Sequence, residues 1–80
     1  MGASQDKTAK KIAIQLGHAI RARREGEELS QDELAWRADI HRAYMGTIER
    51  GEQNITVFKL FQIARGLGVS PSELLQDIGL

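Results

Sequence analysis

The segment from Ser30 to Gly51, SQDELAWRADIHRAYMGTIERG, constrains the fold more than any other part of the chain. Ser30 and Glu33 have the spacing of a capping box, in which each side chain satisfies a free backbone N–H at the start of a helix. Asp39 can adopt the left-handed backbone conformation that a sharp turn requires. Gly51 is a typical helix stop. The segment therefore predicts two short helices, the first starting at Gln31, joined by a tight turn at Asp39 and Ile40.

Apolar and polar positions separate these two helices into an inner and an outer face. The inner positions are Leu34, Ala35 and Ala38 in the first helix, and Met45 and Ile48 in the second. The small alanines allow another helix to come close. The positions expected to face outward on the second helix, which we expect to begin at His41, are Arg42, Ala43, Gly46, Thr47 and Arg50.

A long helix is predicted before this segment. Ile12, Leu16 and Ile20 recur at four-residue steps and indicate a helix from about Thr8 to Glu25, which Gly26 would end. Gly17 inside it lowers helix propensity by about 1 kcal/mol relative to alanine, which a close helix contact would explain. We expect residues 1–7 to form a flexible polar arm.

Two further helices are predicted after the segment. Thr56 can cap a helix whose expected buried positions are Val57, Leu60, Ala64 and Leu67. Ser70, Pro71 and Glu73 form a second start signal, for a helix that runs to about Ile78. Because the connectors are short and no strand pattern is present, the sequence predicts an all-α, compact five-helix bundle with a single domain over residues 8–80.

Composition excludes several classes of function. With 80 residues and no cysteine, the chain can build one small core and has no disulfide or thiolate metal site, which fits a cytoplasmic protein. We expect no signal peptide and no membrane span, because no apolar run is long enough. His18 and His41 lack a second ligand at helical spacing, so no metal is expected. Neither a glycine-rich phosphate loop nor a nucleophile with a nearby base is apparent, so we predict no enzyme, no cofactor and no small-molecule ligand.

The charges are balanced in number but segregated along the chain. The formal net charge is zero. Every charge from Lys7 to Arg24 is positive, whereas the charges from Glu25 to Asp39 are negative except for Arg37. A chain of this kind that bound a polyanion would have to keep its acidic residues away from the phosphates, and its non-specific affinity would be modest.

The segment resembles the helix-turn-helix of the Cro and phage-repressor (XRE) family. The matching residues are Gln31, Leu34, Ala35, Ile40, Ile48, Glu49 and Gly51, and Asp39 departs from the glycine preferred at the turn. The run IHRAYMGTIERGEQNIT is most similar to the controller proteins of restriction–modification systems, and the similarity extends from about Leu16 to Leu75. The resemblance implies a lambda-repressor-like DNA-binding domain that regulates transcription.

This resemblance assigns roles to particular residues. Those expected to contact bases are His41, Arg42, Ala43, Gly46 and Thr47, since arginine can pair with guanine and methyl groups can touch thymine. Those expected to contact phosphates are Gln31, Tyr44, Arg50, Gln53 and Asn54. Arg24 and Glu49 are expected to form a partly buried structural ion pair, and Arg21 and Arg23 to lie on the surface.

The remaining apolar residues suggest a partner surface. Phe58, Phe61, Leu75, Ile78 and Leu80 are more than a small five-helix core can easily enclose, and exposed patches of this kind mark interfaces. A two-fold homodimer would place two recognition helices one DNA turn apart on an inverted repeat in double-stranded DNA. Trp36 is expected to be partly buried against the N-terminal helix predicted from about Thr8 to Glu25. A second hypothesis remains open: a protein-interaction module with the same fold, such as an antitoxin, which the zero net charge would suit.

Overall fold

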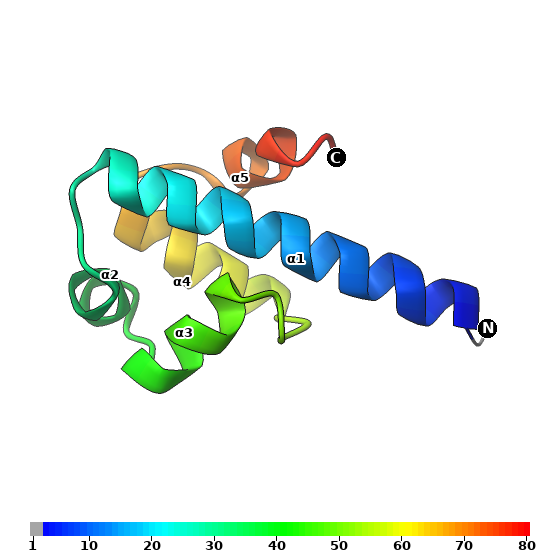
Figure 1. Ribbon diagram of the computed structural model, residues 1–80. Coiled ribbons are helices and arrows are strands. Elements are labelled where there is room, and N and C mark those ends of the chain that lie inside the picture. Colours follow the sequence, from blue (N-terminus) through cyan, green and yellow to red (C-terminus); the bar gives the residue numbers. More distant parts are fainter. Residues whose placement is uncertain (1–2) are drawn as a thin grey trace.

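The computed structural model describes residues 3–80, with side chains from residue 6 onward, and over that range the chain forms five helices and no strand. The helices are α1 (Ala3–Gly26), α2 (Gln31–Ala38), α3 (Arg42–Glu49), α4 (Val57–Leu67) and α5 (Pro71–Asp77). This is the predicted all-α fold. In Figure 1, α1 is the longest element, with α2 and α3 on one side of it and α5 on the other.

Helix α1 begins earlier than predicted. It starts at Ala3 and not near Thr8, so residues 3–7, expected to precede the helix as an arm, are helical. No glycine or proline interrupts this stretch, and Asp6 in the first turn complements the helix dipole. Met1 and Gly2, the rest of the predicted arm, lie outside the described residues. The N-terminal turns of α1 extend past the other helices (Figure 1).

The predicted helix caps are present. The Oγ of Ser30 accepts the N–H of Glu33 at 3.0 Å, and Oε1 of Glu33 accepts the N–H of Ser30 at 2.8 Å. This second hydrogen bond, to a backbone donor, is the main reason that the pKa of Glu33 is lowered. Ser70 and Glu73 form the same capping box at α5, and Thr56 caps α4. Local side-chain chemistry therefore fixes where three of the helices start.

The turn between α2 and α3 has the predicted geometry. Asp39 is left-handed, with φ 58° and ψ 45°, and the N–H of Ile40 donates to the carbonyl of Ala35 at 2.9 Å. The side chain of Ile40 is buried. Helix α3 begins at Arg42, one residue later than predicted, because His41 is extended and serves as its N-cap.

All five helices contribute to one core. Its largest fully buried side chains are Ile20, Leu34, Met45, Ile48, Ile63 and Leu74. A Cβ at Gly17 would lie 2.6 Å from the carbonyl oxygens of Ile48 and Glu49, so α1 and α3 touch through their backbones and only glycine fits. Val57, expected in the core, is 83% exposed because the first turn of α4 precedes its contact with the core.

The described helices contain no stretch that is both long and apolar enough to cross a membrane.

Glu49 is the centre of a buried polar cluster that joins α1, α2 and α3. Its carboxylate accepts two hydrogen bonds from Arg24, Nε to Oε2 at 2.8 Å and Nη2 to Oε1 at 3.0 Å. It accepts a third from Nε2 of Gln31 at 2.9 Å. Arg24 also donates from Nη1 to the carbonyl of Leu29 at 2.8 Å. The side chains of Arg24 and Glu49 are only 11% and 2% exposed, so the structure contains the expected ion pair, more buried than expected.

A second ion pair fastens α5 to α1. Arg23 donates from Nε to Oδ2 of Asp77 at 2.5 Å and from Nη2 to Oδ1 at 3.0 Å. Arg23 thus lies near the surface, as predicted, but with an ion-pair partner that was not predicted. Asp77 is distant along the chain, and no local pattern links the two residues. The hydrogen bonds from the Arg23 guanidinium hold the pKa of Asp77 below its usual value.

Removing one partner of the buried pair should be strongly destabilising. We expect Glu49→Ala to lower the free energy of unfolding by about 3–5 kcal/mol, because the Arg24 charge would remain buried without its counter-ion. The matched control is the double variant Arg24→Met, Glu49→Leu, which removes both charges and should lose much less. Denaturant unfolding of the three proteins measures the difference. A double variant as unstable as Glu49→Ala would contradict this role.

The Arg23–Asp77 pair should make stability depend on acid pH. Because the pKa of Asp77 is lower in the folded protein, its contribution is complete above the unfolded value of about 4 and is lost as the pH falls through the folded value. We expect the wild type to be more stable than Asp77→Asn at pH 7, with a gap that closes below about pH 4. Urea midpoints of both proteins across this range test it, and a gap independent of pH would refute it.

Candidate nucleic-acid interface

The outer surface of α3 forms a shallow depression, which we call the recognition face. It is lined by Gln31 from the start of α2 and by His41, Arg42, Ala43, Gly46 and Arg50. The side chains of Arg42 and Ala43, on the first turn of α3, are exposed. Met45 and Ile48 on the opposite side of α3 are buried in the core, and Glu49 is hydrogen-bonded to Arg24 of α1. The first turn of α3 is therefore fixed relative to the rest of the domain.

Arg42 is exposed but not unpaired. Its Nε lies 2.6 Å from Oδ1 of Asp32 on α2, and both side chains are largely in solvent. No local pattern in the sequence indicates this contact, because the two residues lie on different helices. A surface ion pair of this kind contributes about 0–1 kcal/mol, so a ligand can displace it at small cost.

Of the three other candidates for base contact, two are less open than expected. Gly46 is buried and not open, since a Cβ there would meet the side chains of Arg50 at 3.4 Å and Gln31 at 3.7 Å. Thr47 is half-buried, and its hydroxyl donates to the carbonyl of Tyr44 at 2.7 Å. His41 is exposed, and its Nδ1 accepts the N–H of Ala43 at 3.2 Å. Gly46 is thus the floor of the recognition face, and His41 caps its helix.

The phosphate candidates near α3 are also engaged within the chain. Nε2 of Gln31 donates a hydrogen bond to Glu49, so the amide nitrogen of Gln31 is engaged in the buried cluster. Arg50 forms two hydrogen bonds with Glu52, at 2.9 and 3.2 Å. These bonds hold the pKa of Glu52 below its usual value. The ring of Tyr44 packs against the core, with Nζ of Lys59 5.9 Å from its centroid.

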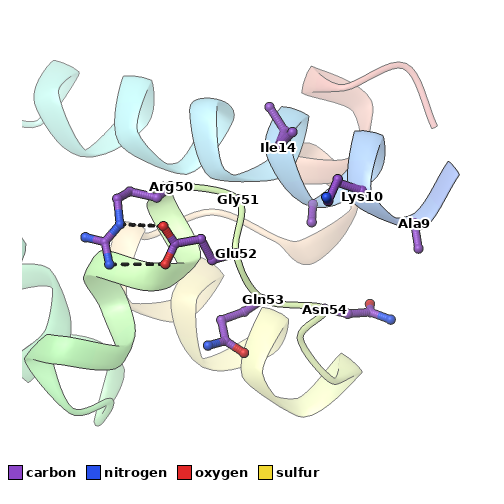
Figure 2. A pocket seen from close by; sticks show the side chains of 9 residues that line it. Ala9, Lys10, Ile14, Arg50, Gly51, Glu52, Gln53 and Asn54 are labelled. Carbon is purple, nitrogen blue, oxygen red and sulfur yellow. Dashed lines mark hydrogen bonds and ion pairs between the residues drawn. The ribbon is translucent and has the colours of Figure 1, made fainter. Parts of the chain in front are cut away.

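The loop after α3 borders a second depression, which we call the α1–loop depression. It is lined by Ala9, Lys10, Ala13 and Ile14 of α1 and by residues 50–54. Figure 2 shows Lys10 on α1 beside this loop, with the Arg50–Glu52 pair at one end and Asn54 at the other. Of the two phosphate candidates in this loop, Gln53 is half-buried and Asn54 is exposed. Lys10 was not among the sequence candidates, although it belongs to the positive N-terminal run.

The expected partner surface is divided between two helices. Phe58 and Phe61 on α4 are exposed and stack at a centroid distance of 6.2 Å. Leu80 is also exposed, but Leu75 and Ile78 are half-buried and pack against the core. Trp36 is 85% exposed, so its expected burial against α1 is wrong. On an eight-residue helix with Leu34, Ala35 and Ala38 turned inward, it is directed to solvent.

Among the described residues, no three His, Cys, Asp or Glu side chains are grouped so that they could hold a metal ion.

Comparisons with known proteins agree with this geometry. The family described as "Helix-turn-helix domain" matches residues 15–76. The control protein C.MunI of a Mycoplasma species is 38% identical over 68 residues, which are 84% of this chain and 92% of that protein. The control protein C.BamHI of Bacillus amyloliquefaciens is 37% identical, over 80% of each chain. The structure of the restriction–modification controller protein C.AhdI from Aeromonas hydrophila superposes with a TM-score of 0.78 and 31% identity, covering 80% of this chain and 97% of that one.

The capped helix pair, its buried Arg24–Glu49 support and these matches lead to one conclusion. The chain belongs to the helix-turn-helix family that includes the controller proteins of restriction–modification systems.

Proposed function

We propose that this protein is a sequence-specific DNA-binding transcription regulator that acts as a homodimer on an inverted-repeat operator, in the manner of a restriction–modification controller protein. The observation that carries the proposal is the recognition face, where Arg42 and Ala43 are exposed on the first turn of a rigidly supported helix. In helix-turn-helix proteins, the N-terminal residues of the second helix contact base edges in the major groove.

The chemistry of these two side chains fits base recognition. A guanidinium can donate two hydrogen bonds to O6 and N7 of a guanine, and the methyl of Ala43 can contact the methyl of a thymine. Nε of Arg42 lies 2.6 Å from Asp32 in the free protein. This exposed pair is weak, so hydrogen bonds from the guanidinium to a base can replace it when DNA binds. We assign Arg42 the main part in sequence selection, with Ala43 beside it.

Phosphate contacts would surround this centre. The start of α2 offers backbone N–H groups, which suit an anion, and Gln31 lies there on the recognition face. Asn54 is exposed on the loop after α3, and Arg50 lines both depressions. These groups would set the orientation of the protein on the duplex without reading its sequence. The contacts of His41, Thr47, Tyr44 and Gln53 belong to the same proposal.

A homodimer would use the exposed aromatic side chains of α4. Phe58 and Phe61 are stacked in solvent, and the guanidinium of Arg65 lies 5.4 Å from the ring of Phe61. Large exposed apolar groups of this kind favour association with a partner. A two-fold axis would then repeat the recognition face at a distance of about 34 Å, which matches one turn of DNA. Leu75, Ile78 and Leu80 would form the margin of this interface.

The first test has two steps. The preferred duplex is selected from a randomised library with the wild-type protein, and the binding of Arg42→Ala to that duplex is then measured. We expect this change to weaken binding to the selected duplex by about 1–3 kcal/mol and to relax preference at one base pair. Asn54→Ala is the matched control, because loss of a phosphate contact should weaken all duplexes about equally.

Equal losses on the selected and random duplexes for Arg42→Ala would overturn its assignment. A wild-type protein that selects no duplex at all would support the protein-interaction module instead.

The second test is the oligomeric state. Phe58→Glu places a charge in the proposed interface at an exposed position, so it should give a monomer without unfolding the chain. Trp36→Glu changes an even more exposed aromatic residue outside that surface and should leave the dimer intact. Sedimentation equilibrium measures both masses. A Phe58→Glu protein with the mass of the wild type would exclude α4 as the interface.

A further inference from the structure

The N-terminal half of α1 lies outside the region matched by the helix-turn-helix family. The family match begins at residue 15, whereas α1 begins at Ala3. The loop after α3 crosses α1 at the point where these additional N-terminal turns join the shared domain, so the turns stay in contact with the domain there. A Cβ at Gly51 would lie 2.6 Å from Cα of Ile14, so the loop backbone rests directly on the helix. The α1–loop depression is formed at this crossing (Figure 2).

The depression carries one uncompensated positive charge. Arg50 is neutralised by Glu52 through two hydrogen bonds. Lys10 has no ion-pair partner among residues 6–80, whose side chains the structure describes. The other polar groups around it, the amides of Gln53 and Asn54, are neutral and can donate hydrogen bonds. The charge and donors of the site suit an anion.

The depression is also continuous with the recognition face. Arg50 lines both surfaces, with Arg42 and Ala43 on one side and Lys10 and Asn54 on the other. DNA lying along α3 would therefore continue towards Lys10. The anion that this position offers is a phosphate of the DNA backbone.

We propose that Lys10 binds a backbone phosphate of the operator DNA, so that the N-terminal extension of α1 enlarges the interface of the shared domain. This inference rests on the proposed function. The contact is to phosphate and carries no sequence information, so it should contribute equally on every duplex. It would partly offset the absence of net positive charge in the chain as a whole.

The test compares Lys10→Gln with Lys11→Gln in the full-length protein. Both variants remove one charge from exposed positions of the same helical turn, but Lys11 does not line the depression. Successive helical residues point about 100° apart, so Lys11 is turned away from the proposed contact. Circular dichroism should show an unchanged helix content in both. Binding is measured by fluorescence anisotropy on the selected duplex and on a randomised duplex, from about 50 to about 200 mM salt.

For Lys10→Gln we expect binding at about 100 mM salt to weaken about three- to tenfold on both duplexes. The slope of log affinity against log salt should become shallower by about 0.9, so that the rise from about 50 to about 200 mM salt weakens the variant about 3.5-fold less than the wild type. Lys11→Gln should keep the wild-type slope.

Three results would overturn the inference while leaving the proposed function intact. Lys10→Gln could keep the wild-type slope, which would show that no phosphate contact is lost. Both variants could reduce the slope equally, which would indicate the general field of the helix and not a contact. Loss confined to the selected duplex would indicate base recognition. Failure of the proposed function is a different result, in which the wild type selects no duplex.

Discussion

The position of α3 depends on the buried carboxylate of Glu49. This helix has eight residues, too few to be stable alone, so its place in the molecule is set by contacts with other elements. A negative charge in the last turn of a helix opposes the helix dipole and would be unfavourable without a partner. Arg24 supplies that partner through two hydrogen bonds, and Gln31 donates a third. Because the three donors come from α1 and α2, the end of α3 is fixed relative to both helices. Well-packed apolar residues could stabilise the core as well, and we therefore regard the geometry of the cluster as its main contribution.

Local signals made much of the fold predictable. The capping boxes at Ser30 and Ser70, the left-handed Asp39 and the apolar periodicity each act within one or two helical turns. They are present as expected, with Val57 as the exception in the periodicity. The predicted start of α1 is too late because Ala3 begins a helix without a strong cap in the sequence. The site was predictable in outline, including the exposure of Arg42, but its side-chain partners were not. The Arg42–Asp32 and Arg23–Asp77 pairs form between separate helices, and no periodicity within one helix reports them.

Positive and negative side chains also balance each other at the recognition face, as they do in the chain as a whole. Arg42 lies against Asp32, and Arg50 lies against Glu52, so each cation there has a carboxylate beside it. Binding DNA would exchange these contacts for contacts with bases and phosphates and would not simply attract a polyanion to a positive surface. Exposed pairs are weak, so the exchange costs little, but the carboxylates stay close to the duplex and reduce its general attraction. A protein arranged in this way should depend on base contacts for a larger share of its affinity than a strongly basic one would.

The extension of α1 is the one part of the proposed interface that lies outside the shared domain. A positive charge on a flexible arm would lose conformational freedom on reaching the DNA, at a cost of about 1–2 kcal/mol for each residue ordered. Lys10 is already held in a continuous helix, and the contact of Gly51 with Ile14 fixes that helix against the loop that carries Asn54. Lys10 and Asn54 are therefore placed relative to each other before DNA arrives. The same contact ties the loop to the C-terminal end of α3, so a phosphate held at Lys10 would help to set how α3 enters the groove.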